Sequence, residues 1–258
     1  MSVLWHHTMP EDFFYILRCL HPNLSIAIIK DRKCVGESEE TVTNKNSDIN
    51  VEQKHTRIYL IRHGESEWNA AGDLYCGRTD IGLSKEGVTQ AKNAGDFLSS
   101  VAFDRAYASP LIRARDTAEL ILGERNLPIQ LDERIYEGDF GEWEGRSKAA
   151  FIKEDPDSWE SWMANPWETR AGRTGETARE MYERASAFFK EVSDKHPGET
   201  VLVVAHNNTI RFFLAGILGM PFSNYRRIFQ DNTGINVLDV DGDDLLIRSL
   251  NINAHLND

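Results

Sequence analysis

The sequence predicts a three-layer α/β/α sandwich built on a mostly parallel central sheet. From Arg57 onward, short apolar segments with strand character alternate with longer segments in which apolar residues recur at helical spacing. The segment TVLVVA (200–205) is apolar throughout, as expected of a parallel strand that helices cover on both faces. The chain has 258 residues, 41% of them hydrophobic and 27% charged, which is enough to bury a core of ordinary size.

The alternation begins with RIYLI (57–61), a short apolar strand that ends in a turn containing glycine. The segment 86–100 is expected to be helical because one face carries the apolar residues Val88, Ala91, Ala94 and Leu98. Further elements are expected at 104–109 (strand), 111–122 (helix) and 128–131 (strand).

The second half of the domain follows a segment rich in tryptophan and in loops, residues 132–173. A long helix is expected over about 176–195 and ends at Pro197-Gly198. A helix at 208–218 follows the buried strand. The last expected strands are 235–240 and 245–250, which form a hairpin with Gly242 at the tight point of its turn.

Residues 1–56 differ in composition from the rest, and we expect them to form an N-terminal extension to a domain at 57–258. The segment 9–20 predicts a short amphipathic helix and 24–29 a strand, whereas 36–55 has the polar composition of a linker. The extension could cover a pocket, decorate the surface or mediate dimerisation, so a homodimer stays among the alternatives.

Composition excludes several classes of function. The 29 Lys and Arg residues against 41 Asp and Glu give a net charge of −12, which argues against nucleic acid or a membrane as a partner. Three scattered cysteines indicate neither a disulfide framework nor a zinc ribbon. The N-terminus lacks a secretory pattern and no apolar stretch could span a bilayer, so we expect a cytoplasmic protein.

Charged and polar residues follow the expected strands at the points where the strands end. Arg62 and His63 follow the first strand, Arg113 comes soon after the second, Glu137 lies in the loop after the third, and His206 follows the buried strand. Ligands bind at the carboxyl ends of parallel strands, so these side chains should meet at one edge of the sheet. Taken singly, each has an ordinary structural explanation. Together, two arginines, two histidines and a carboxylate suit a small phosphomonoester substrate.

Five motifs stand in order along the chain: LIRHGESEWN (60–69), GRTDIGLSKEG (77–87), ASPLIRARDTA (108–118), IYEGDFGEWEG (135–145) and VVAHNNTIR (203–211). In order and spacing they resemble the motifs of the histidine phosphatase superfamily, also called the phosphoglycerate-mutase-like family. The resemblance covers residues 57–256. It implies a phosphoglycerate-mutase-like fold and a phosphatase that uses a histidine nucleophile.

The resemblance also implies a role for each residue of the site. His63 resembles the nucleophile that becomes phosphohistidine, and Glu137 resembles the proton donor. Arg62 and Arg113 resemble the clamps on the phosphoryl oxygens, and His206 resembles the second histidine of the pocket. Neutralisation of the phosphate by these cations requires neither a metal nor another cofactor.

Two asparagines and one helix N-terminus extend the expected phosphate site. Asn69 matches a polar residue that also touches the phosphate in the family. Asn207 stands where the family usually has glycine, which allows a left-handed backbone or close approach to a ligand. Asparagine is the next most tolerant residue for that conformation. The helix that starts near Asn208 is expected to aim its first amides at the phosphate.

The segment between Glu137 and His206 helps to distinguish a phosphatase from a phosphoglycerate mutase. Mutases of the family carry a longer, more basic insertion there, whereas residues 147–177 are acidic and hold few cations. This favours a phosphomonoesterase over a 2,3-bisphosphoglycerate-dependent phosphoglycerate mutase. A non-catalytic phospho-ligand-binding regulatory module is disfavoured because the five principal site residues are intact. Four tryptophans either roof the mouth of the pocket or belong to the core: Trp143, Trp159, Trp162 and Trp167.

Overall fold

The computed structural model describes residues 55–256, apart from residues 73 and 243. The helix predicted at 9–20, the strand predicted at 24–29 and the linker up to residue 54 lie outside the described residues. The boundary between the extension and the main domain therefore stays a prediction.

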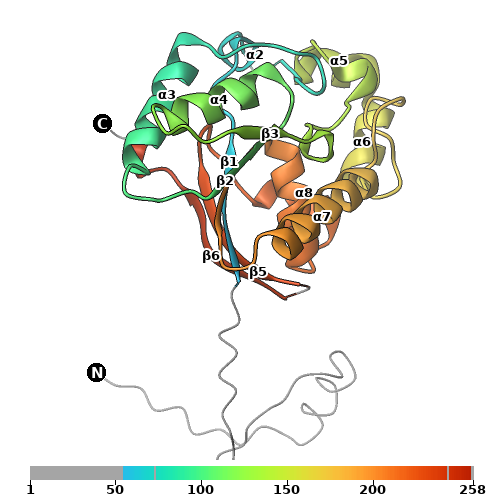
Figure 1. Ribbon diagram of the computed structural model, residues 1–258. Coiled ribbons are helices and arrows are strands. Elements are labelled where there is room, and N and C mark those ends of the chain that lie inside the picture. Colours follow the sequence, from blue (N-terminus) through green and yellow to red (C-terminus); the bar gives the residue numbers. More distant parts are fainter. Residues whose placement is uncertain (1–54, 73, 243, 257–258) are drawn as a thin grey trace, which may run out of the picture. The chain divides into compact units, whose positions relative to one another are not determined.

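A six-stranded sheet forms the centre of the domain, in the order β3-β2-β4-β1-β5-β6 (Figure 1). The strands are β1 (Thr56–Arg62), β2 (Arg105–Ala108), β3 (Ile129–Leu131), β4 (Thr200–Ala205), β5 (Ile235–Asp241) and β6 (Asp244–Ile252). The first four in sequence run parallel to one another, and β5 runs antiparallel to both β1 and β6. The predicted, mostly parallel sheet is confirmed, as is the closing hairpin, whose turn contains Gly242 at φ 59°.

Helices cover both faces of this sheet. The helices are α2 (Glu67–Ala70), α3 (Lys85–Phe97), α4 (Ile112–Leu122), α5 (Lys148–Glu154), α6 (Pro156–Ala164), α7 (Ala178–Lys195) and α8 (Asn207–Ile217). Short 3₁₀ turns lie at η1 (Glu133–Ile135), η2 (Gly141–Trp143), η3 (Phe222–Arg227) and η4 (Ala254–Leu256). Figure 1 shows α3 and α4 on one side of the strands and α7 and α8 on the other. The predicted three layers are present.

Successive side chains of the central strands point to opposite faces of the sheet and form a hydrophobic core on each face. In β4, Val201 and Val203 pack with α7 and α8, whereas Leu202 and Val204 pack with α3 and α4. All four side chains are fully buried. A strand that is buried on both faces needs no polar residue at alternate positions, which explains the continuous apolar segment.

The segment 132–173, which was expected to be rich in loops, also contains two helices that were not predicted, α5 and α6. Both are short, and both begin with capping groups that the sequence contains: the side chains of Ser147 and Asp155 accept backbone hydrogen bonds, and Pro156 occupies the first turn of α6. Helices of this length have too few turns to show a clear apolar period. No helix in the described part of the chain is long and apolar enough to cross a membrane.

Candidate active site

The carboxyl ends of the four parallel strands place the predicted site residues at one edge of the sheet. Arg62 is the last residue of β1, and His63 follows it. His206 follows β4 as the N-cap of α8, and Arg113 lies in the first turn of α4, after β2. The ring centroids of His63 and His206 are 5.1 Å apart. Two imidazoles separated by 143 positions in the sequence thus lie side by side because β1 and β4 are neighbours.

His63 is held in one tautomer by its own loop. Its Nδ1 lies 2.6 Å from the carbonyl oxygen of Gly64, so Nδ1 carries the proton and Nε2 keeps its lone pair. Burial lowers the pKa of His63 well below its usual 6.5, and the nearby guanidinium groups of Arg113 and Arg62 lower it further. The ring is therefore neutral at physiological pH and has a free nucleophilic nitrogen.

The loop that carries His63 packs directly on the start of α3. A Cβ atom added at Gly64 would lie 2.5 Å from the carbonyl oxygen of Gly87, closer than real Cβ atoms approach an oxygen. The amide of Gly64 donates to Thr117 Oγ1 at 3.0 Å, and this hydroxyl donates to the carbonyl oxygen of Arg113. The glycine after His63 is thus needed for close packing, and the same contacts connect the loop to the helix of Arg113.

His206 is fully buried beside His63. Neither of its ring nitrogens has a hydrogen-bond partner among the described residues. Burial lowers the pKa of His206 well below 6.5, and the charges of Arg113, His63, Arg184 and Arg62 add to the effect. A buried imidazole that the protein leaves without a partner is costly, which is typical of a group whose partner is a ligand.

Arg113 is also fully buried. Its Nη1 and Nη2 donate to the carbonyl oxygens of Thr79 and Gly77 at 2.9 and 2.7 Å, and its Nε has no partner in the described part of the chain. The loop that supplies these carbonyls is fixed by Glu144, whose carboxylate accepts from the backbone amide of Thr79 at 3.0 Å. Arg62 donates from Nη1 to the carbonyl oxygen of Gln230 at 2.7 Å. Both guanidinium groups are oriented by backbone carbonyls.

Glu137 lies at the N-terminus of α8. Its Oε1 accepts from the amides of Gly138 and Thr209 at 2.9 and 3.1 Å, and its Oε2 accepts from the amide of Asn208 at 3.1 Å. The prediction that the first amides of this helix point at a phosphate is therefore wrong for Asn208 and Thr209. These amides bind the carboxylate instead, because an acidic side chain complements the positive end of the helix dipole.

The two asparagines of the expected phosphate site differ in environment. Asn69 forms a capping box with Ser66, whose amide donates to Asn69 Oδ1 at 3.2 Å. Asn207 is the first residue of α8, and it is not among the described residues with positive φ, so the expectation of a left-handed backbone there is wrong. A helical residue at this position needs no glycine. Asn207 lines the cleft, and its Oδ1 is buried without a hydrogen-bond partner among the described residues.

A cleft of about 430 Å³ opens beside these groups. Five of the predicted residues line it: Arg62, His63, Asn69, Glu137 and Asn207. Arg113 and His206 do not belong to its lining, because their side chains are fully buried. The volume is suited to a small metabolite.

The comparisons with known proteins agree with this arrangement. The model of the "Histidine phosphatase superfamily (branch 1)" matches residues 58–253. The chain belongs to this superfamily. It is 32% identical to the adenosylcobalamin/alpha-ribazole phosphatase of Escherichia coli over 198 residues, which are 77% of this chain and 97% of that protein. It is 33% identical to phosphoserine phosphatase 1 of Hydrogenobacter thermophilus over 202 residues, 78% of this chain and 95% of that one.

A solved structure agrees in fold as well. The structure named Bacillus stearothermophilus YhfR has a TM-score of 0.74 and 30% identity, covering 78% of this chain and all of that one. The superfamily member described here is accordingly a phosphatase with a phosphoglycerate-mutase-like fold.

Arg184 is a residue of this phosphatase that the sequence did not indicate. Its Nη1 donates to the carbonyl oxygens of Arg134 and Tyr136 at 2.8 and 2.7 Å, and its Nη2 donates to that of Glu137 at 3.2 Å. Glu176 pairs with the same guanidinium at 3.0 Å. Arg184 therefore positions the loop of Glu137. It lies in the middle of the amphipathic helix α7, where an arginine in sequence looks like a solvated residue.

Two of the four tryptophans belong to the core, and none of the four lines the cleft. Trp143 and Trp162 are 2% and 1% exposed and belong to the core, so the roof interpretation is wrong for them. Trp162 donates from Nε1 to Tyr225 Oη at 3.2 Å. Trp159 packs partly buried against the same core and carries two cations on its ring, those of Lys148 and Arg226.

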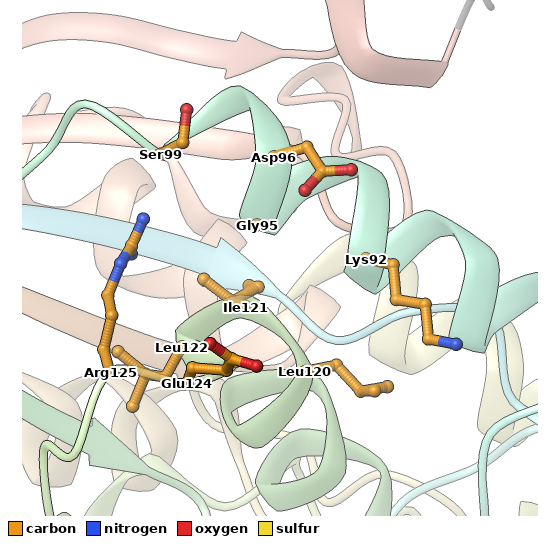
Figure 2. Close-up of a pocket in the computed structure, with 10 residues that line it drawn as sticks. Lys92, Gly95, Asp96, Ser99, Leu120, Ile121, Leu122, Glu124 and Arg125 are labelled. Carbon is orange, nitrogen blue, oxygen red and sulfur yellow. The ribbon is translucent and has the colours of Figure 1, made fainter.

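The described part of the phosphatase shows no second catalytic centre. A hollow of about 590 Å³ lies between the C-terminal halves of α3 and α4 (Figure 2), and it contains none of the predicted site residues. Its lining includes Gly95, where the two helices approach each other, and the charged side chains at its rim point in different directions in Figure 2. The described residues contain no group of three or more His, Cys, Asp or Glu side chains that could hold a metal ion.

Proposed function

We propose that this phosphatase hydrolyses a small phosphorylated metabolite through a phosphohistidine on His63, without the help of a metal ion. The observation that carries the proposal is the tautomer of His63, whose Nε2 lone pair is free beside buried, unpartnered nitrogens of His206 and Arg113. A phosphoryl group at this spot would give those nitrogens the partners that the protein does not provide.

The first step would transfer the phosphoryl group to His63. Nε2 forms a bond to phosphorus while the bond from phosphorus to the ester oxygen breaks. Arg62, Arg113 and His206 would stabilise the charge on the phosphoryl oxygens in the transition state. An alkoxide leaves poorly, so the protonated carboxyl of Glu137, which lines the same cleft, would give its proton to the departing oxygen.

The second step would return the enzyme to its starting state. Water attacks the phosphorus of phosphohistidine, and the carboxylate of Glu137 takes one of its protons. The bond between phosphorus and Nε2 breaks, inorganic phosphate leaves, and His63 is again neutral with its Nδ1 proton still donated to Gly64. Glu137 gives up one proton in the first step and regains one in the second, so no other proton donor or acceptor is required.

Hydrolysis of p-nitrophenyl phosphate in the presence of EDTA tests the proposal. We expect turnover in EDTA, and loss of turnover in His63→Ala. The matched control is His55→Ala, because His55 lies before β1, with a half-exposed side chain paired to Asp239. Rapid quenching with a ³²P-labelled substrate should trap a label on the protein that is lost in acid and kept in base, as expected of phosphohistidine.

Three outcomes would contradict the proposal. Undiminished hydrolysis by His63→Ala would exclude His63 as the nucleophile, and loss of wild-type activity in EDTA would show a metal requirement. Interconversion of phosphoglycerates that depends on 2,3-bisphosphoglycerate, with no release of phosphate, would favour a mutase instead.

A further inference from the structure

Three cations line the part of the cleft that lies outside the predicted phosphate site. They are Lys148 at the start of α5, Arg211 in α8 and Arg226 in η3, and all three belong to the lining of the same cleft as His63. Elements far apart in the sequence bring them together. In a chain of net charge −12, a local concentration of positive charge needs a specific explanation.

The cations are held in place by aromatic rings and neutral oxygens. Arg226 donates from Nη2 to Tyr75 Oη at 2.6 Å, and its guanidinium lies 4.9 Å from the ring centre of Trp159. Lys148 Nζ lies 4.8 Å from the centre of the same ring. Arg211 donates from Nε to the carbonyl oxygen of Ile228 at 2.7 Å. The ring of Trp159 thus contacts both the ammonium of Lys148 and the guanidinium of Arg226. Such cation–π contacts fix the positions of the charged groups without neutralising their charge.

No carboxylate of the described residues forms an ion pair with any of the three cations. The charge of Glu137 acts on Arg211 and raises its pKa, although burial outweighs this effect. The two acidic residues that line the cleft are engaged elsewhere: Asp231 accepts from Asn251 and Asn253 at 2.9 Å each, and Glu137 accepts from the amides of α8. The Nε of Arg226 is buried without a partner.

Electrostatics within the cleft agree with an anion at this position. Burial lowers the pKa of Lys148, and the neighbouring Arg226 lowers it further. Burial likewise lowers the pKa of Arg211, and the charge of Arg226 adds to it, whereas Tyr225 and Tyr75 raise the pKa of Arg226 itself. Like charges that line one cleft destabilise one another, and an anion between them would remove that cost.

We propose that the phosphatase takes substrates with a second anionic group, a carboxylate or a second phosphate, which binds between Lys148 and Arg226. The proposal rests on the proposed function, because the first anion is the phosphoryl group held near His63. Arg62, Arg113 and the histidines already suffice for that group, so the outer cations are available for the rest of the molecule. Lys148 and Arg226 are then specificity-determining residues, and neutral phosphomonoesters are the poorer ligands.

The test uses phosphonates, which bind but are not hydrolysed, so its result does not depend on turnover. Propylphosphonate and 3-phosphonopropionate have nearly the same shape and differ by one carboxylate, and propane-1,3-bisphosphonate has a second phosphonate in its place. Calorimetric titration of the full chain should show that one or both probes with a second anionic group bind about 10-fold more tightly than propylphosphonate. This is the range expected of one charge-assisted hydrogen bond. Which probe gains the advantage distinguishes a carboxylate from a phosphate.

Variants with matched controls locate the effect. For each probe with a second anionic group, we compare its affinity with that of propylphosphonate in the same variant. In Lys148→Gln and in Arg226→Gln this ratio should fall at least severalfold toward one. In Lys153→Gln, on the exposed side of α5, and Arg227→Gln, the exposed neighbour in η3, the ratio should stay at its wild-type value. Because each ratio is measured within one variant, a general loss of binding cancels.

Two results would overturn the inference. One is equal affinity of wild type for all three phosphonates. The other is tighter binding of a probe with a second anionic group than of propylphosphonate that persists in both Lys148→Gln and Arg226→Gln. Either can occur while p-nitrophenyl phosphate is hydrolysed normally, so failure of the second anion site is distinguishable from failure of the phosphohistidine mechanism.

Discussion

Replacement of Glu137 by glutamine separates the chemical role of its carboxyl from its structural role. The change preserves the size of the side chain and removes its ability to exchange a proton. With an alkyl phosphate as substrate, loss of a proton donor should lower kcat/KM, which reports the steps up to departure of the alcohol, by about 10²–10⁴-fold. With p-nitrophenyl phosphate the loss of kcat/KM should be much smaller, because p-nitrophenolate is a good leaving group and departs without a proton.

The same change has a structural cost that follows from the contacts of Glu137. Its two oxygens accept from three backbone amides, those of Gly138, Asn208 and Thr209. In glutamine one of these oxygens becomes an NH₂ group, which leaves at least one buried N–H donor without an acceptor. This costs about 1–3 kcal/mol, so the free energy of unfolding in urea should fall by that amount.

Glu133→Gln is the matched control for both measurements, because Glu133 is an exposed carboxylate at η1, just before the same loop. It should change neither the rates nor the unfolding free energy appreciably. Equal losses of kcat/KM for alkyl and nitrophenyl substrates in Glu137→Gln would refute the assignment of Glu137 as the proton donor. An unchanged unfolding free energy would refute the structural part of the reasoning.

Two other predictions concern stability. The pKa values of His63 and His206 lie well below 6.5 in the folded protein because both rings are buried, so below pH 6.5 the unfolded chain binds more protons than the folded one. The unfolding free energy should therefore fall as the pH drops below 6.5, by up to about 1.4 kcal/mol per pH unit for each histidine. Urea titrations should show a shallower dependence in His206→Gln, and an unchanged slope would count against the burial argument. Gly64→Ala should lower stability by about 1–3 kcal/mol, because its Cβ would meet the carbonyl oxygen of Gly87 at 2.5 Å. Gly82→Ala, which adds a Cβ in open space, should not, and similar losses in both would contradict the packing explanation.

Much of the fold follows from local patterns in the chain. The continuous apolar segment 200–205 is β4, the helical spacing after residue 176 is α7, and the glycine turn at Gly242 closes the last hairpin. These elements are long or chemically distinctive, so their period identifies them. The helices α5 and α6 were missed because one or two turns show no clear period, although their capping residues were readable.

The candidate site was predictable as a set of residues but not in its contacts. Strand ends and motif order indicated Arg62, His63, Arg113, Glu137 and His206. The choice of Glu137 as the partner of the α8 amides was not indicated, because it depends on where a loop returns after β3. The role of Arg184 was hidden for the same reason.

The three outer cations of the cleft show most clearly what could not be predicted from the sequence. Lys148, Arg211 and Arg226 are distributed over 79 positions of the chain, and the segment that holds Lys148 is acidic on average. Charge counted along the sequence therefore suggested few cations near the substrate. Their concentration arises only when α5, α8 and η3 fold around one cleft.

The succession of strands and helices along the chain and the identities of the candidate site residues were thus indicated locally, by periodicity and by short motifs of adjacent residues. The surroundings of the substrate beyond its phosphate were decided by tertiary structure, because electrostatic interactions depend on distance in space, and residues far apart in sequence carry no local record of that distance.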